Sequence, residues 1–213
     1  MNLKYSKIAV ALCALFLTAA TAAQAITLWD QSAISLDPNA PSIANWKATG
    51  FGGGIVHSVD DVTVSGMAWH VTSITEYYST WNPNWTSLTQ GYLHVWPKTG
   101  ALPTQNPTVD PIVSMTCVDT GDPNGVFAIT ASGLDLTLPP GDYWIGITPI
   151  ASAGAFGANN QWPALNTIGA PVASYDTAWH NYYGNYDGAM KVEGDLPTPT
   201  SNTTWGRIKT LYH

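Results

Sequence analysis

The chain has 213 residues, with seven Lys and Arg against 14 Asp and Glu, and a formal net charge of −7. A surface of that sign repels phosphate backbones, which argues against nucleic acid and anionic membrane surfaces as partners. Only 10% of the residues are charged, whereas Gly, Pro, Thr, Ser, Asn, Trp and Tyr are plentiful, a balance that favours strands and polar turns over helices.

The first 25 residues have the pattern of an export signal. Lys4 and Lys7 give a positive start, residues 8–20 form an uncharged apolar stretch, and an Ala-Gln-Ala cleavage site ends at Ala25. The apolar stretch is shorter than the roughly 20 residues that span a membrane, so we expect removal of the segment and a mature chain beginning at Ile26, without a transmembrane segment. That chain has five Lys and Arg against 14 Asp and Glu, a net charge of −9. We expect a bacterial protein that is secreted, extracellular or at the cell surface, with the periplasm as the alternative.

The 188 residues of the expected mature chain suffice for one domain with a single core. We predict a β-sandwich domain over residues 26–195 and a linker with a short tail over residues 196–213. Cys13 leaves with the signal, so Cys117 is alone in the mature sequence, and stability must come from burial and sheet hydrogen bonds rather than from an intramolecular disulfide. We predict that Cys117 is a small buried hydrophobic residue, with pairing between chains as the alternative.

Alternating apolar and polar residues predict strands with one buried face. Between Val71 and Ile74 the alternation changes phase, which predicts a bulge or strand break near residues 72–73. Trp69, Trp96 and Trp144 fall within strand patterns and are predicted core residues. The spacing of the further predicted strands fits an all-β, antiparallel, jelly-roll-like sandwich: residues 55–57, 59–64, 92–96, 112–118, 126–130, 134–138, 143–148 and 189–193.

The segment GLDLTLPPGDYWIGI, residues 133–147, predicts a β-hairpin. Its three leucines alternate along one run, residues 139–142 read as a turn, and an aromatic and apolar run returns the chain. Residues 151–186 are long, irregular and rich in Gly, Asn, Pro and aromatics, which is typical of a functional loop.

Four segments together resemble a group of exported bacterial β-sandwich proteins: VDDVTVSGMAWHVTSITEYY (59–78), GYLHVWPKTGALP (91–103), GLDLTLPPGDYWIGI (133–147) and DGAMKVEGD (187–195). In that group an Asp-Asp-Phe strand opens the motif, a Pro-Gly-x-Tyr-Trp hairpin follows, and an Asp-x-Ala strand closes the domain. The resemblance implies a jelly roll similar in outline to carbohydrate-binding modules, and supplies no catalytic residues. Many members carry a Pro-Glu-Pro sorting anchor. Here Pro197 and Pro199 lie in a linker that no apolar span follows, and Val62 replaces the usual Phe.

Two clusters of loop aromatics are the candidate ligand-binding residues. Aromatic rings beside amides suit sugars, because sugar CH groups stack on the rings while amide and carboxylate groups bond the hydroxyls. The alternative is that the rings close the ends of the core, and with ten Trp and ten Tyr some must do so. The predicted glycan site consists of Trp81, Asn82, Asn84, Trp85, Tyr175, Trp179, Tyr182 and Tyr183.

The turn DTGDPNG offers oxygen ligands for Ca²⁺ at Asp119, Asp122 and Asn124. Its spacing does not match an EF-hand, so a tight acidic turn without an ion is the alternative. No other cofactor is expected.

The five histidines lack the i, i+4 or His-x-His pairing of a metal site. We expect hydrogen-bonded sheet histidines, and His70 and His94 are the pair that neighbouring strands could bring together.

Catalysis is disfavoured by the sequence. It contains two glutamates, Glu76 and Glu193, and no Gly-x-Ser-x-Gly elbow. Asp60 and Asp61 are adjacent on a predicted strand and would point to opposite faces, so they are not expected to act as a pair, and one of them is expected to be solvated or to bond a turn.

The tail ends in TWGRIKTLYH, a short amphipathic and basic piece for which we hypothesise a role in sorting or assembly. Taken together, these patterns predict an exported protein that is not an enzyme and acts as a binding or structural component. Its expected partner is a polysaccharide or a component of the cell envelope. A self-associating structural subunit, which binds copies of itself, is the alternative, and a glycan-active hydrolase comes third.

Overall fold

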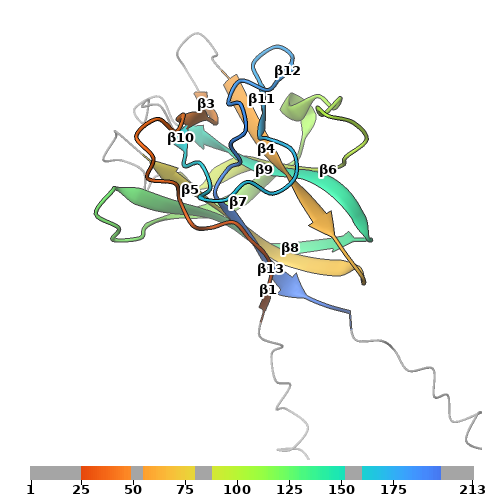
Figure 1. Cartoon of the computed structure of the whole chain (residues 1–213). Coiled ribbons are helices and arrows are strands. Elements are labelled where there is room, and N and C mark those ends of the chain that lie inside the picture. The colour runs from red at the N-terminus through yellow and green to blue at the C-terminus, as the bar shows by residue number, and fades with distance from the viewer. Residues whose placement is uncertain (1–24, 49–54, 80–87, 152–159, 198–213) are drawn as a thin grey trace, which may run out of the picture.

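The computed structural model describes residues 25–48, 55–79, 88–151 and 160–197 (Figure 1). Residues 1–24 of the predicted signal peptide, residues 81–85 of the predicted glycan site and the predicted tail from residue 198 lie outside them. One short 3₁₀ helix, η2 (Pro107–Val109), is the helical element of this part of the chain. The strands are, in chain order, β1 (Ile26–Asp30), β2 (Ile43–Ala44), β3 (Trp46–Ala48), β4 (Ile55–Val64), β5 (Trp69–Ser79), β6 (Gln90–Pro97), β7 (Ile112–Asp119), β8 (Val126–Leu138), β9 (Gly141–Ala151), β10 (Asn160–Gln161), β11 (Ala173–Tyr175), β12 (Trp179–His180) and β13 (Met190–Asp195).

The strands form one continuous curled sheet. Its main path runs β1-β13-β5-β8-β7-β6-β9-β3-β4-β11-β12, and β2 and β10 attach beside β5. All pairings between these strands are antiparallel except that of β3 with β9. The predicted all-β class is therefore confirmed. The finer description as a jelly-roll-like sandwich stays a prediction, because the strands belong to one hydrogen-bonded path.

Strand β7 is the corner at which the sheet turns. Its first three residues pair with β6, and Met115 to Asp119 pair with β8. The two parts of the sheet that meet at β7 enclose one hydrophobic cluster, to which β4, β5, β6, β8, β9 and β13 all contribute. Trp69 and Trp144 are buried and Trp96 is 8% exposed, as predicted, and Cys117 packs half-buried against the cluster.

The predicted change of phase in β5 is a β-bulge. On the side of β13 the adjacent residues Glu193 and Gly194 pair with Ser73 and Val71, so Thr72 is the extra residue. Val71 and Ile74 are both fully buried, which strict alternation would not allow. The bulge prediction is therefore confirmed.

The predicted hairpin over residues 133–147 is wrong. Strand β8 pairs with β5 and β7, whereas β9 pairs with β6, β4 and β3, and no pairing joins β8 to β9. The two-residue link consists of Pro139 and Pro140. A type I′ turn requires positive φ at both central residues, which the proline ring forbids, so the link carries the chain across to the other part of the sheet.

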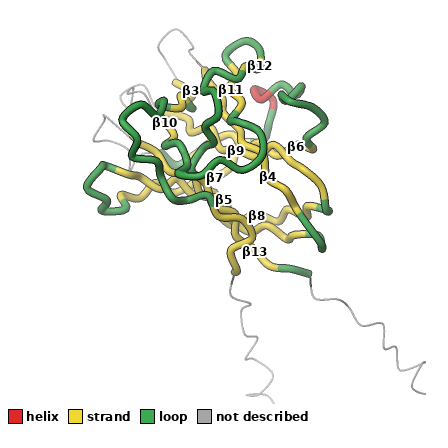
Figure 2. Tube along the Cα trace, viewed as in Figure 1, coloured by secondary structure: helices red, strands yellow, loops and turns green. Residues whose placement is uncertain are grey.

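The last two strands of the path fold back over part of the outer face of the sheet and form a small outer layer. The hairpin of β11 and β12 pairs with β4 and lies against β6, where Trp179 contacts Trp96 edge to face at 5.7 Å between ring centroids. Ala173, Val59 and Trp144 complete this small cluster. Figure 2 shows the long loop segments gathered on this side of the molecule.

Two buried carboxylates of β4 hold the connection between β10 and β13 in place. Asp61 accepts a hydrogen bond from the backbone N–H of Ala170 and forms an ion pair with Lys98. Asp60 accepts a hydrogen bond from the backbone N–H of Gly188. Asp60 and Asp61 are 2% and 5% exposed, so neither is solvated, and both bond backbone N–H groups of the long connection. Burial, the largest influence, raises the pKa of Asp60 well above its usual value.

Candidate functional site

A groove of about 390 Å³ lies between the β11–β12 hairpin and the loop that follows β6. One wall consists of Tyr175, Ala178 and Trp179, and the other of residues 102–106, with the sequence Leu-Pro-Thr-Gln-Asn. Its volume falls within the range of ligand pockets, roughly 300–1,000 Å³. The groove is open to solvent and therefore suits a ligand that lies along the surface.

The two aromatic rings of the groove lie side by side. The ring centroids of Tyr175 and Trp179 are 5.3 Å apart at 57°. The indole N–H of Trp179 donates to the backbone carbonyl of Gln105 over 2.7 Å and so ties the two walls together. Because both rings are only half-buried, each keeps some surface for a ligand, and their mutual contact limits how far either can move.

Amide groups of the facing wall complete the site. Asn106 caps η2: its Oδ1 accepts hydrogen bonds from the backbone N–H and the hydroxyl of Thr108. These bonds fix the Asn106 side chain, which lines the same groove as the rings. The side-chain oxygen of Gln105 accepts from the backbone N–H of Thr104. Both residues line the groove, and amide N–H groups are donors that suit a hydroxyl-rich ligand.

Negative charge lies close to the groove. Asp176 follows Tyr175 at the tip of the hairpin, and a hydrogen bond from the backbone N–H of Thr177, the largest cause, lowers its pKa. Asp110 lies behind the groove, where it accepts from the indole N–H of Trp96. These carboxylates favour neutral over anionic ligands.

Only some of the predicted aromatic residues lie in the groove. Tyr175 and Trp179 meet in the groove, whereas Tyr182 and Tyr183 lie outside its lining. Tyr182 is 56% exposed, stacks on His180 and donates to Asp176. The hydroxyl of Tyr183 accepts from the backbone N–H of Ala44, which is a structural contact.

Sequence reasoning missed the loop that forms the second wall. Its Thr-Gln-Asn run, residues 104–106, is polar and lies in the loop after β6, and that was the available signal. Nothing local indicates that these residues face Trp179, because the contact spans more than 70 residues of chain.

Beneath the groove lies a chain of polar side chains that is buried except at Asp110, whose side chain is 12% exposed. His94 Nδ1 lies 2.6 Å from Asp110 Oδ2, and His94 Nε2 lies 3.1 Å from His57 Nδ1 and 2.9 Å from Thr148 Oγ. Thr148 donates in turn to Asn45 Oδ1. Burial is the main cause that lowers the pKa of His94, so its ring is neutral and donates through Nδ1 to Asp110.

This arrangement corrects one expectation and bears on catalysis. His94 meets His57 rather than His70, which instead bridges Asp135 and Asp195 on the other part of the sheet. The order Asp110, His94, Thr148 resembles that of a nucleophilic triad. However, Thr148 is fully buried and its hydroxyl hydrogen is donated to Asn45, so it is unavailable as a nucleophile.

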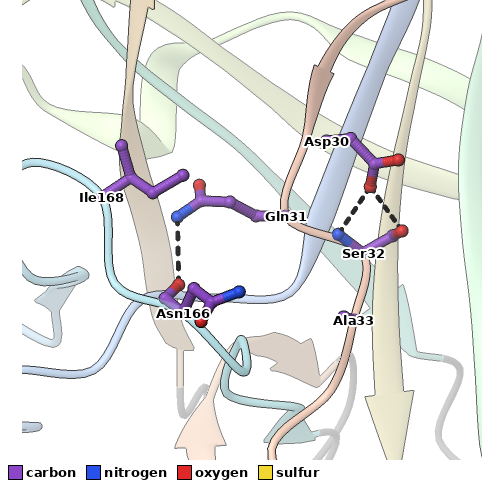
Figure 3. A pocket seen from close by; sticks show the side chains of 6 residues that line it. All are labelled: Asp30, Gln31, Ser32, Ala33, Asn166 and Ile168. Atoms are coloured by element: carbon purple, nitrogen blue, oxygen red, sulfur yellow. Dashed lines mark hydrogen bonds between the residues drawn. The ribbon is translucent and has the colours of Figure 1, made fainter.

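A second cavity, of about 290 Å³, lies between the end of β1 and the long connection (Figure 3). Gln31 crosses it: its amide donates to Asp187 and to the carbonyl of Asn166, and its oxygen accepts from the indole of Trp29. No aromatic ring lines this cavity, and the buried amide of Gln31 serves to join strand and connection. The cavity is lined by Asp30, Gln31, Ser32, Ala33, Asn166 and Ile168.

The predicted calcium loop is a tight turn between β7 and β8. Asp119 Oδ1 accepts from the backbone N–H of Gly121, and Asp122 Oδ1 accepts from the backbone and side-chain N–H of Asn124. Gly121 and Gly125 have positive φ, as such a turn requires. Among the described residues no group of three or more His, Cys, Asp or Glu is placed to hold a metal ion, and calcium here stays a prediction.

Comparisons with family models, curated proteins and solved structures found no match to this chain. In the part of the chain that the structure describes, no helix has the length and apolar character needed to cross a membrane.

Proposed function

We propose that this protein is a non-catalytic, exported binding module that holds a neutral polysaccharide in the groove between β12 and residues 102–106. The observation that carries the proposal is the pair of adjoining, half-exposed rings, Tyr175 and Trp179, facing Gln105 and Asn106 across one groove. Rings provide stacking surfaces for sugar CH groups, and the amides supply donors for hydroxyls.

The charge of the chain supports the neutral class of glycan. Asp176 and Asp110 lie at the tip and back of the groove, and the predicted mature chain has a net charge of −9. An acidic polysaccharide would meet repulsion from both the site and the whole surface. We therefore expect uncharged chains to be retained and polyuronates to be excluded.

Binding is favoured over hydrolysis by the lining of the groove. A glycosidase places two carboxyl groups roughly 5–10 Å apart on either side of the scissile bond. The described residues that line the groove include no carboxylate. The ring pair and amides are suited to holding a chain, not to proton transfer.

The test is retention of purified protein on a panel of insoluble and soluble polysaccharides, neutral and acidic. We expect binding to at least one neutral glycan, and about a tenfold loss in Trp179→Ala, because an aromatic stacking contact contributes on the order of 1 kcal/mol. Trp179→Phe, which keeps a ring in the groove, should lose less. Tyr77→Ala changes a half-buried aromatic of β5 outside the groove and should bind like the wild type.

Two outcomes would contradict the proposal. An equal loss of glycan binding in Tyr77→Ala and Trp179→Ala, or binding only to acidic glycans, would show that the groove is not a site for neutral glycans. If no glycan is retained and light scattering shows a stable oligomer, the self-associating subunit becomes the better reading.

A further inference from the structure

Glu76 is a buried carboxyl group that the proposed glycan site does not use. It lies on β5, is 1% exposed and points into the main core. Its Oε1 accepts a hydrogen bond from the backbone N–H of Ile147 over 2.7 Å, and its Oε2 lies 2.6 Å from the hydroxyl of Tyr78. No Lys or Arg is among the groups that act on it.

The shortest hydrogen bonds around Glu76 Oε2 require one more hydrogen than the neighbours supply. Four contacts of 2.9 Å or less need a hydrogen: Tyr78 Oη to Glu76 (2.6 Å), Tyr78 Oη to the carbonyl of Ile147 (2.9 Å), and Asn45 Nδ2 to Tyr78 Oη (2.7 Å) and to the same carbonyl (2.9 Å). A fifth contact, from Asn45 Nδ2 to Glu76 Oε2, is longer at 3.3 Å and shares an Asn45 hydrogen. Asn45 has two hydrogens and Tyr78 has one. An ionised Glu76 would leave two of the oxygens at hydrogen-bond distance with no hydrogen between them.

We propose that Glu76 is a neutral carboxylic acid in the folded protein at neutral pH and donates its proton to the hydroxyl of Tyr78. Tyr78 then donates to the carbonyl of Ile147, and Asn45 donates to both, so each of the four contacts has its hydrogen. The arrangement makes the core sensitive to alkaline pH, because loss of this proton leaves one of the four contacts without a hydrogen. The inference concerns the fold and stands whether or not the groove binds glycan.

The titratable groups around Glu76 and its partner Tyr78 come from four strands. Tyr78 lies on its own strand and Cys117 on β7, while His57 on β4 and His94 on β6 connect to it through Thr148 and Asn45. Burial raises the pKa of Tyr78 and of Cys117, and lowers that of His94, so none of these three adds charge at neutral pH.

The neighbouring strand β13 supplies no counter-ion. Met190 pairs with Glu76 and Lys191 pairs with Thr75, so Lys191 lies on the opposite face of the sheet, where it binds Glu193. Burial, the largest cause, raises the pKa of Glu76 to about 8.

The sign of the pH effect follows from these values. The unfolded chain releases the Glu76 proton near its ordinary pKa of 4.5, and the folded chain keeps it until about 8. The contribution of Glu76 to the free energy of unfolding is therefore largest below pH 4.5 and is lost as the pH rises to 8. One proton held by the folded state alone corresponds to about a tenfold increase in the unfolding equilibrium constant per pH unit across that window.

The direct test is ¹³C NMR of the intact protein labelled at glutamate side-chain carboxyl carbons. The sequence contains two glutamates, so two signals are expected, and Glu193→Gln assigns them. We expect the Glu76 signal at the position of a neutral acid at pH 7, moving to that of a carboxylate with a midpoint near 8. Carboxylate positions for both signals at pH 7 would overturn the proposal.

The second test is urea unfolding from pH 5 to pH 9. Glu76→Gln keeps an acceptor for Ile147 and a donor for Tyr78, so it should fold, and the ratio of its unfolding constant to that of the wild type should change about tenfold per pH unit up to pH 8. Glu193→Gln, a matched change at a partly exposed site, should follow the wild type. Parallel pH profiles for wild type and Glu76→Gln would refute the inference.

Discussion

Replacing Asn45 by alanine should destabilise the protein more than replacing an exposed polar residue would. The buried Asn45 side chain bonds both the hydroxyl of Tyr78 and the hydroxyl of Thr148. Asn45 is fully buried. Its Nδ2 donates to Tyr78 and to the carbonyl of Ile147, and its Oδ1 accepts from the backbone N–H of Ser58 and from Thr148.

The magnitude follows from which partners can find replacements. Thr148 can turn its hydroxyl toward His94 Nε2, 2.9 Å away, and Glu76 can still donate to Tyr78. The N–H of Ser58 loses this acceptor inside the core, at a cost of about 2 kcal/mol. The weakened bonding of Tyr78, Thr148 and the Ile147 carbonyl should add about 1 kcal/mol. We therefore expect the free energy of unfolding to fall by about 3 kcal/mol, which corresponds to a fall in Tm of roughly 10 °C for a domain of this size.

The assay is urea unfolding followed by tryptophan fluorescence, with Asn39→Ala as the control. Asn39 is exposed and bonds locally to Asp37. A loss below about 1 kcal/mol for Asn45→Ala, similar to the control, would refute the account of Asn45 as the link between Tyr78 and Thr148.

Two further predictions concern the layer that carries the groove. Asp61→Asn should keep the bond from Ala170 but leave Lys98, whose side chain is 19% exposed, without its carboxylate; we expect a loss of about 2 kcal/mol in urea unfolding, and a change below 0.5 kcal/mol would contradict it. Gly146→Ala should cost about 2 kcal/mol or more because its Cβ would lie 2.4 Å from the carbonyl oxygen of Ser58. Gly100→Ala, with 3.7 Å to its nearest neighbour, is the matched control, and equal stability of the two variants would show that the sheet accommodates the methyl group.

The strand positions and the β5 bulge could be predicted because they follow from local rules. Side chains of a strand alternate between faces, so the apolar phase of β5 before and after Thr72 fixes the bulge without knowledge of the partner strand. The same alternation identified Trp69, Trp96 and Trp144 as core residues.

Strand partners could not be predicted in the same way. The runs on either side of Pro139 and Pro140 alternate as a hairpin would, yet β8 and β9 pair elsewhere. Pairing depends on which neighbours bury the apolar face, and that choice is made by the whole sheet. For the same reason His94 pairs with His57 and not with His70.

By itself the sequence determined the all-β class, the alternating strands and the presence of aromatic residues suited to a contact surface, because these depend on neighbours along the chain. Only the tertiary structure decided that Tyr175 and Trp179 face Gln105 and Asn106, that Tyr183 is tied to Ala44, and that Glu76 lies beside Tyr78 and Asn45. Those contacts join residues up to 139 positions apart. Their formation depends on how the sheet curls at β7, and no local pattern of apolar and polar residues encodes that curl.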